Sequence, residues 1–124
     1  MLRNTIMEII LDTNFLLVPL QFNIDIFEEL EKMGYSTFII LGNVEKEANK
    51  IGLKEYAAIK KLLKDKHIKT ITSDTRNTDT AIFEYAKKHK CAVATNDKAL
   101  IKKLKKEHVI IIRMRQKKYL IIEN

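Results

Sequence analysis

The sequence has few of the residues that build turn-rich or covalently cross-linked folds. Its 124 residues include three Gly, one Pro and one Cys. So few Gly and Pro argue against a turn-rich β-sandwich. A single cysteine, Cys91, excludes an internal disulfide and argues against a cysteine-based metal or redox site. We therefore expect one domain over residues 1–124, built from helices with short connections.

Long apolar runs and an excess of acidic residues are also missing. No run approaches the roughly 20 apolar residues of a membrane-spanning helix, and no apolar signal segment opens the chain. We therefore expect a cytoplasmic protein that does not associate with the membrane. Hydrophobic residues form 46% of the chain, which indicates a folded protein. The 23 basic residues outnumber the 16 acidic ones, and the resulting charge of +7 favours a polyanionic partner such as nucleic acid.

Short β-branched runs alternate with amphipathic segments along the chain. Strands are predicted over residues 8–11, 37–41, 68–71, 91–95, 109–112 and 119–122. Helices are predicted over residues 24–33, 44–51, 53–63, 79–88 and 97–106. This alternation is typical of βαβ units. The predicted fold class is α/β: a three-layer α/β/α sandwich around a mainly parallel five-stranded sheet, with the last segment as an extra edge strand.

The three histidines share one local pattern. His67, His89 and His108 each follow a lysine-rich helix end and precede a predicted strand. Cations at that position complement the negative end of the helix dipole. In a parallel sheet these junctions lie opposite the strand carboxyl ends, so we expect none of the histidines to be catalytic.

Two aspartates follow predicted strands at the other edge of the sheet. Asp12 comes directly after the first strand, and Asp97 comes shortly after the fourth. Because ligands of open α/β sheets bind beyond the strand carboxyl ends, both carboxylates are candidates for one site. Each also has a structural alternative: Asp12 as the cap of the next turn, and Asp97 as an acid in a first helical turn.

Two further acids lie on predicted helices. Glu47 lies on an otherwise apolar helical face, which is formed by Val44, Glu47, Ala48 and Ile51. A buried carboxylate is costly unless it is paired or binds a metal. The alternative is a buried cationic or hydroxyl partner, or a place at the rim of the stripe. Asp79 lies in the first turn of its helix, where the helix dipole alone accounts for an acid.

The four acids are more informative together than singly. They come from the starts or inner faces of four predicted helices and can meet at one sheet edge: Asp12, Glu47, Asp79 and Asp97. Their mutual repulsion would be severe without cations. All-oxygen ligands suit Mg²⁺ or Mn²⁺, and such a site can bind a phosphate oxygen and lower the pKa of a water. The sequence therefore predicts metal-dependent hydrolysis of phosphodiesters.

Four segments carry a resemblance to a known family. In chain order they are "ILDTNFLL" at 10–17, "NVEKEA" at 43–48, "NTDTAI" at 77–82 and "VATNDKAL" at 93–100. Together they resemble the PIN-domain nucleases. The resemblance implies a three-layer α/β/α fold and endonuclease activity on single-stranded RNA that depends on Mg²⁺ or Mn²⁺.

The resemblance also implies roles for individual residues. The family's catalytic, metal-binding acids map onto Asp12, Glu47, Asp79 and Asp97. Asn14 matches a position that often supports the first acid, and Thr95 matches the polar residue before the last acid. Many members carry a second acid where this chain has Thr80. That difference bears on how a second metal site would be completed.

RNA is the partner that this interpretation implies. Basic residues at the strand-end edge are candidates to bind its phosphates: Lys46, Arg76, Lys98, Arg113 and Arg115. For each of them, an ordinary solvated surface charge is the alternative. Replacing a true phosphate contact would weaken binding to all RNA sequences.

The C-terminal segment, residues 109–122, resembles the branch of the family related to the rRNA-processing endonuclease, so we expect a role in rRNA processing. One alternative is a toxin ribonuclease with an antitoxin partner. Another is a non-catalytic RNA-binding or assembly factor with the same fold, and a homodimer is compatible with each. A receiver-like signalling domain is disfavoured, because Thr13 and Asn14 rather than acids follow Asp12.

Overall fold

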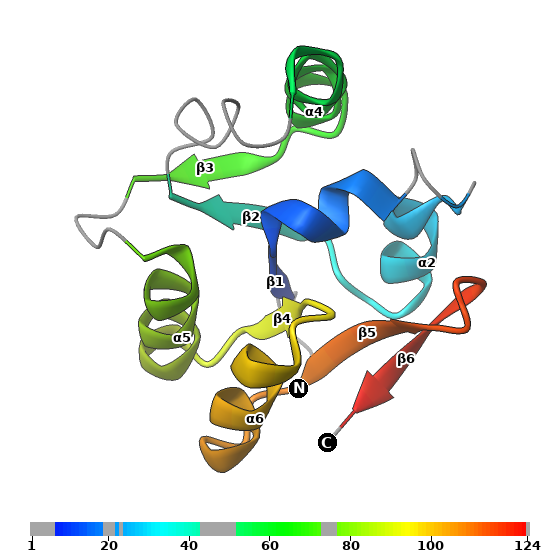
Figure 1. The fold of residues 1–124 in the computed structure, drawn as a ribbon. Coiled ribbons are helices and arrows are strands. Elements are labelled where there is room, and N and C mark those ends of the chain that lie inside the picture. The colour runs from blue at the N-terminus through cyan, green and yellow to red at the C-terminus, as the bar shows by residue number, and fades with distance from the viewer. Residues whose placement is uncertain (1–6, 19–21, 23, 43–51, 73–76, 124) are drawn as a thin grey trace, which may run out of the picture.

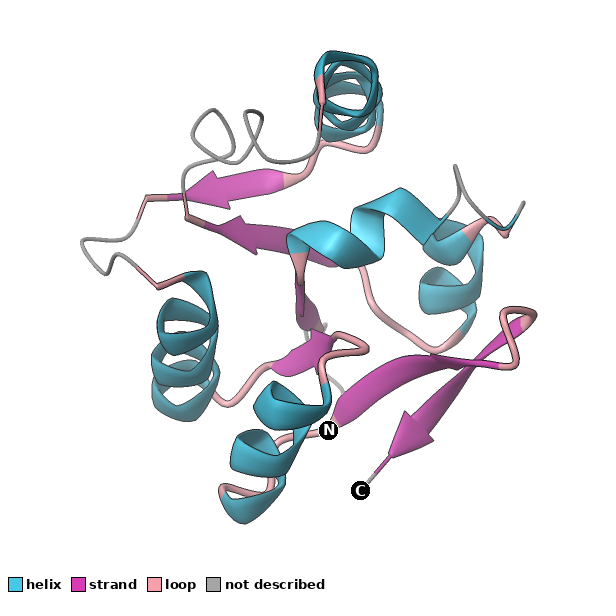
Figure 2. Cartoon of the chain, in the orientation of Figure 1, coloured by secondary structure: helices cyan, strands magenta, loops and turns pink. Residues whose placement is uncertain are grey.

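Strands and helices alternate through the molecule, as the sequence predicts (Figure 1; Figure 2). The computed structural model describes residues 7–18, 22, 24–42, 52–72 and 77–123. The strands are β1 (Glu8–Leu11), β2 (Thr37–Leu41), β3 (Lys69–Ile71), β4 (Ala92–Ala94), β5 (Ile111–Arg115) and β6 (Tyr119–Glu123). The helices are the 3-10 helix η1 (Thr13–Leu17) and the α-helices α2 (Ile26–Lys32), α4 (Leu53–Asp65), α5 (Thr78–His89) and α6 (Lys98–Lys106).

The described strands form one sheet in the order β3-β2-β1-β4-β5-β6. Neighbours from β3 to β5 pair in parallel, and β6 pairs antiparallel with β5. The mainly parallel sheet and its extra C-terminal edge strand are therefore confirmed. Parallel strands are buried on both faces, which accounts for the nearly continuous apolar sequences of β1 and β2.

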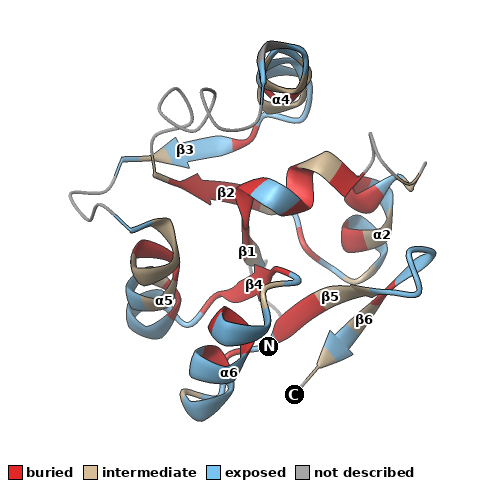
Figure 3. Cartoon of the chain, viewed as in Figure 1, coloured by how far each residue is buried: buried red, intermediate tan, exposed pale blue. Residues whose placement is uncertain are grey.

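Helices cover both faces of the sheet and produce the predicted three layers (Figure 3). The helices η1, α2 and α4 enclose one core, which includes Phe27, and α5 and α6 enclose the other, which includes Leu104. Successive residues of β1 serve the two cores in turn. Ile9 and Leu11 pack in the first and Ile10 in the second, as the two-residue period of a strand requires.

Capping side chains decide where two of the helices begin. The helix predicted over 24–33 begins at Ile26, because Asp25 Oδ1 accepts a hydrogen bond from Glu28 N (3.1 Å). The helix predicted over 97–106 begins at Lys98, because Asp97 is its N-cap. In the described part of the chain, no helix combines the length and apolar character needed to cross a membrane.

The fifth strand begins and ends two to three residues later than the predicted span of 109–112. Val109 N still donates to Leu104 O (3.3 Å), so this residue closes α6 before the strand starts at Ile111. The strand then continues to Arg115 because β6 pairs with it along its whole length. The hairpin therefore carries β5 beyond the apolar run that marked it in the sequence.

Lysine and histidine residues end three helices at the edge opposite the strand carboxyl ends. His67 and His108 follow α4 and α6, and His89 is the last residue of α5. His67, Lys90 and His108 take left-handed backbone conformations with φ of 51°, 56° and 60°, which end the helices. The histidines therefore lie at the predicted edge, away from the acids.

Candidate active site

The centre of the sheet is its topological switch point. From β1 the chain moves outward to β2 and β3 on one side, while β4 starts the run to β5 and β6 on the other. β1 and β4 pair in parallel, with Leu11 opposite Ala94. Ligands of open α/β sheets bind beyond the carboxyl ends of such central strands. Asp12 follows β1 and Asp97 follows β4, so the fold brings both acids to this edge.

Asp12 is a buried carboxylate held by a residue 83 positions away. It is 8% exposed, and its main-chain N donates to Ala94 O (3.0 Å). It occupies the N-cap position of η1, yet its side chain makes no capping hydrogen bond. Instead Oδ2 accepts a hydrogen bond from Thr95 Oγ1 at 2.8 Å. The capping alternative therefore does not explain this aspartate.

Thr95 connects the two central acids. Its side chain is fully buried, and Oγ1 donates to Asp12 while accepting from Asp97 N at 3.1 Å. Asp97 Oδ1 in turn accepts from Ala99 N (2.9 Å) and Leu100 N (3.1 Å), which caps α6. The hydroxyl of Thr95 thus fixes the orientation of one carboxylate and the backbone that carries the other.

Asp79 lies within electrostatic range of both central acids. It is in the first turn of α5, whose N-cap Asn77 accepts from Asp79 N at 2.9 Å. Burial raises the pKa of Asp79 above its usual value, the charges of Asp97 and Asp12 raise it further, and so does a side-chain hydrogen bond with Asp97. A helix-dipole role alone would not produce this coupling, so the structure brings Asp79 to the acid cluster.

Three carboxylates that repel one another fit a divalent cation. Their ligand atoms are all oxygens, as Mg²⁺ and Mn²⁺ prefer, and a cation would relieve the repulsion that raises the pKa of Asp79. Within the described residues, no three acidic, histidine or cysteine side chains are already arranged at metal-binding spacing. The fit therefore rests on the chemistry of Asp12, Asp79 and Asp97 rather than on a preformed cage.

Several residues predicted from the sequence remain without a structural account. Glu47, Lys46 and Arg76 lie outside the described residues. Asn14 is exposed on η1, two positions from Asp12, and its supporting role stays a prediction.

The other predicted basic residues surround the carboxyl end of β5 and the start of α6. Lys98 is the first residue of α6 and is exposed, and Arg115 is exposed at the end of β5. Arg113 is partly buried, and its Nε donates to Glu123 Oε1 at 3.1 Å. Lys98 and Arg113 line the same cavity. Their contact with RNA stays a prediction.

Two residues near the acids were missed by reasoning from the sequence. Lys103 lies close enough to Asp79 to lower its pKa, against the larger effects that raise it. Asn96 lies between Thr95 and Asp97, and its Oδ1 accepts from Met114 N at 2.8 Å. Only its place in the "VATND" segment, next to Asp97, could have pointed to Asn96. Nothing in the sequence distinguishes Lys103 from the other lysines of α6.

Known proteins resemble this chain over most of its length. Ribonuclease VapC4 of Methanocaldococcus jannaschii is 32% identical over 122 residues, which cover 90% of this chain and 93% of that protein. The rRNA-processing protein fcf1 of Schizosaccharomyces pombe is 35% identical over 104 residues, which cover 80% of this chain and 54% of that protein.

Similarity of structure agrees with similarity of sequence. The structure of the PIN domain endonuclease Utp24 matches with a TM-score of 0.78 and 29% identity, covering 94% of this chain and 90% of that one. The model of the PIN-like domain family matches residues 9–117, from β1 to the turn after β5. This chain therefore belongs to the PIN-like domain family.

Proposed function

We propose that this protein is a divalent-metal-dependent endoribonuclease that hydrolyses phosphodiester bonds of single-stranded RNA. The observation that carries the proposal is the convergence of Asp12, Asp79 and Asp97 at the switch point of a PIN-like domain. The names of VapC4 and Utp24, a ribonuclease and an endonuclease, support the same chemistry.

Four acids would hold Mg²⁺ or Mn²⁺ at this edge: Asp12, Asp79, Asp97 and Glu47. When bound, the cation supplies a Lewis acid that lowers the pKa of a water and offsets the charge of a phosphate. In-line attack of water on phosphorus, with the 3′-oxygen as the leaving group, would leave a 5′-phosphate and a 3′-hydroxyl and requires no chemistry of the 2′-hydroxyl.

The chain's own residues would orient and tune this site. Thr95 holds Asp12 in one orientation through a buried 2.8 Å hydrogen bond, which favours a fixed ligand geometry. Asp97 is positioned by its capping bonds to α6. We propose that Asn14 assists Asp12 from η1.

Phosphate contacts would come from cationic residues around the site. We propose this role for Lys46, Arg76, Lys98, Arg113 and Arg115. Lys98 and Arg113 are supported by the cavity that they both line, which also includes Asn96 beside Asp97 in the chain.

The biological role that we favour is rRNA processing. The likeness to the rRNA-processing protein fcf1 supports it. The likeness to VapC4, a ribonuclease matched over 93% of its length, leaves the toxin ribonuclease as the alternative role. Accumulation of unprocessed rRNA on deletion of the gene would support the first role, and growth arrest on expression, relieved by a neighbouring gene, would support the second.

The experiment that tests the activity uses end-labelled single-stranded RNA. Cleavage is expected with Mn²⁺, and it should be abolished by EDTA and by Asp12→Asn. The matched control is Asp65→Asn, which removes the same charge from an exposed position at the end of α4. Cleavage that persists in EDTA or in Asp12→Asn contradicts the proposal, and RNA binding without any cleavage would identify a non-catalytic RNA-binding factor.

A further inference from the structure

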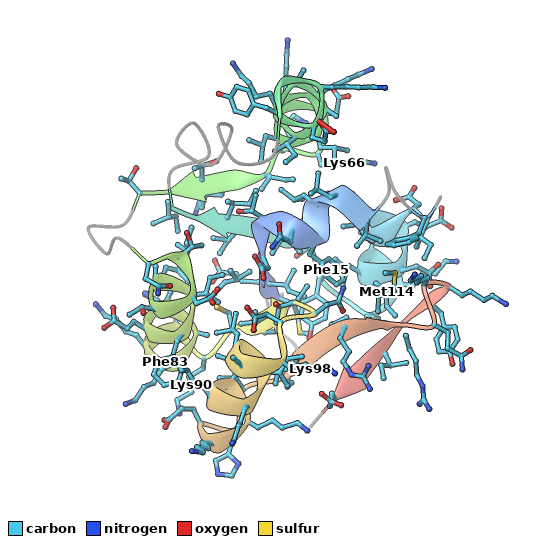
Figure 4. All side chains as sticks on the ribbon, in the orientation of Figure 1. Phe15, Lys66, Phe83, Lys90, Lys98 and Met114 are labelled. Carbon is cyan, nitrogen blue, oxygen red and sulfur yellow. The ribbon has the colours of Figure 1, made fainter. Side chains whose placement is uncertain are left out.

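A cavity of about 540 Å³ lies between α6 and the β5–β6 hairpin, and its lining includes Asn96 and Lys98, the chain neighbours of Asp97. Lys98 at the start of α6 and Met114 on β5 both line it, and Figure 4 labels these two side chains. Sites for small organic molecules usually measure about 300–1,000 Å³, so the cavity is large enough for a nucleotide.

The lining of the cavity is strongly cationic. Four of its side chains carry positive charge: Lys98, Lys102, Lys105 and Arg113. The single acidic residue in the lining is Glu123, so the excess is three positive charges. Such a concentration of cations attracts a polyanion and does not suit a free metal ion.

Glu123 pairs with only two of the four cations. Its carboxylate accepts from Arg113 Nε at 3.1 Å and lies 3.7 Å from Lys105 Nζ. Within the described residues, Lys98 and Lys102 have no ion pair. These two lysines, one turn apart on α6, are therefore the cations most available to phosphates.

Polar and apolar groups accompany these charges. Asn96 Oδ1 accepts from Met114 N at 2.8 Å, which fixes the amide, and its Nδ2 donates to no described residue. Ile101 and Met114 add an apolar wall. An amide donor, an apolar wall and cations together match the base edge, the base plane and the phosphate of a nucleotide.

The geometry points to a nucleotide-binding pocket that holds the RNA nucleotide next to the cleaved bond, with Glu123 competing for Arg113. This inference rests on the proposed ribonuclease function. Its position follows from the chain: Asn96 and Lys98 line the pocket and flank Asp97, so one end of the pocket adjoins the backbone that carries this acid. The apolar wall, and the two lining residues on either side of the proposed catalytic Asp97, favour RNA over an acidic peptide.

The test measures binding of a fluorescein-labelled single-stranded RNA by anisotropy, in EDTA so that no cleavage occurs. Lys98→Ala/Lys102→Ala should raise Kd roughly tenfold. It should also reduce the slope of log K against log salt concentration by about 1.4 in magnitude, at ~0.7 for each lost phosphate contact. Glu123→Gln should instead lower Kd by roughly two- to fivefold, because Arg113 is released to the RNA. If Glu123 has only a structural role, Glu123→Gln should instead weaken or abolish RNA binding.

The matched control is Lys88→Ala/Lys106→Ala. It removes the same charge from exposed helix ends at the opposite edge, and it should leave the salt slope unchanged. A slope that changes equally in both double variants, or in neither, overturns the pocket. The pocket is also overturned if Lys98→Ala/Lys102→Ala loses binding to poly-glutamate but still binds RNA. That result would identify an acidic protein partner.

The pocket and the proposed activity fail in different ways. If Mn²⁺-dependent cleavage is present but the pocket variants bind RNA like wild type, the pocket is wrong and the ribonuclease stands. If wild type binds RNA through the pocket but never cleaves it, the activity is wrong and the pocket stands. If wild type binds no RNA in EDTA, the pocket is overturned whatever the cleavage assay shows.

Discussion

Asp97 has two tasks in the structure that substitutions can separate. Its Oδ1 caps α6 by accepting from Ala99 N and Leu100 N, and its charge belongs to the cluster with Asp79. Asp97→Asn keeps a capping oxygen but removes the charge, whereas Asp97→Ala removes both. We predict that Asn leaves the metal-free protein near wild-type stability and that Ala does not. Both substitutions should abolish Mn²⁺ binding.

The expected magnitudes follow from the geometry of the cap. Replacing an Asp N-cap by Ala costs about 1 kcal/mol, whereas Asn caps about as well as Asp. Asn forfeits a charge–dipole interaction of roughly 0.3–1 kcal/mol. Relief of the repulsion with Asp79 offsets that loss. The free energy of unfolding of Asp97→Asn should therefore lie within about 0.5 kcal/mol of the wild-type value, and that of Asp97→Ala about 1 kcal/mol below the wild-type value.

Urea unfolding in EDTA measures the stability, and calorimetric titration with Mn²⁺ measures the binding. The control pair is Asp25→Asn and Asp25→Ala, since Asp25 caps α2 through a bond to Glu28 N. These variants should reproduce the stability difference and leave Mn²⁺ binding intact. Equal destabilisation by Asn and Ala at position 97 would refute the capping geometry. Undiminished Mn²⁺ affinity in Asp97→Asn would refute its place in the metal site.

Three further predictions concern buried or coupled groups. Thr95→Val removes the hydroxyl that links Asp12 and Asp97. It should lower the free energy of unfolding in urea by about 1–3 kcal/mol and weaken Mn²⁺ binding, whereas Thr95→Ser should preserve both. Equal effects of Val and Ser would contradict the role of the hydroxyl. Because the pKa of Asp79 is raised in the folded state, its ionisation destabilises the metal-free protein above that pKa and has no effect below the usual aspartate value. Asp79→Asn should therefore stabilise the metal-free protein at pH 7, by at most about 1 kcal/mol because solvent screens a partly exposed group. The difference in free energy of unfolding between variant and wild type should shrink as the pH falls towards 4, and a constant difference would contradict this. Burial raises the pKa of the Cys91 thiol to about 11, so this residue should react with a disulfide reagent at pH 8 only after unfolding, and rapid reaction of the native protein would argue against its burial.

The parts of the site that follow from local sequence were predictable. Alternating strand and helix signals predict a parallel sheet, and a parallel sheet places residues after its strands at one edge. The same rule predicts that Asp12 and Asp97 share an edge, which the structure confirms. It also predicts that the three histidines lie away from these acids, and the lysine-rich helix ends that carry them do lie at the opposite edge.

Asp79 shows where such reasoning ends. In the sequence it is an ordinary acid in a first helical turn, which the dipole alone explains. Its coupling to Asp97 and Asp12 depends on how α5 packs beside the switch point, and no periodicity encodes that packing. On its own this signal is weak, and the assignment of Asp79 rests mostly on the family resemblance.

Contacts between distant positions were beyond the sequence for the same reason. The bond from Thr95 to Asp12 spans 83 residues, and the bond from Met114 N to Asn96 spans 18. The cationic cavity arises only when α6 packs beside the β5–β6 hairpin. Reasoning from the sequence nominated Lys98 and Arg113 singly, and the structure shows that they line one cavity with Lys102.

The central claim is that the acids at the switch point bind a divalent cation. The most direct measurement is anomalous diffraction from a crystal of the wild-type protein soaked in Mn²⁺, beside an identically soaked crystal of Asp12→Asn. We predict a manganese peak bounded by the carboxylates of Asp12, Asp79 and Asp97 in the wild type and its loss in the variant. A wild-type crystal without manganese among these acids, or an equal peak in Asp12→Asn, would contradict the account.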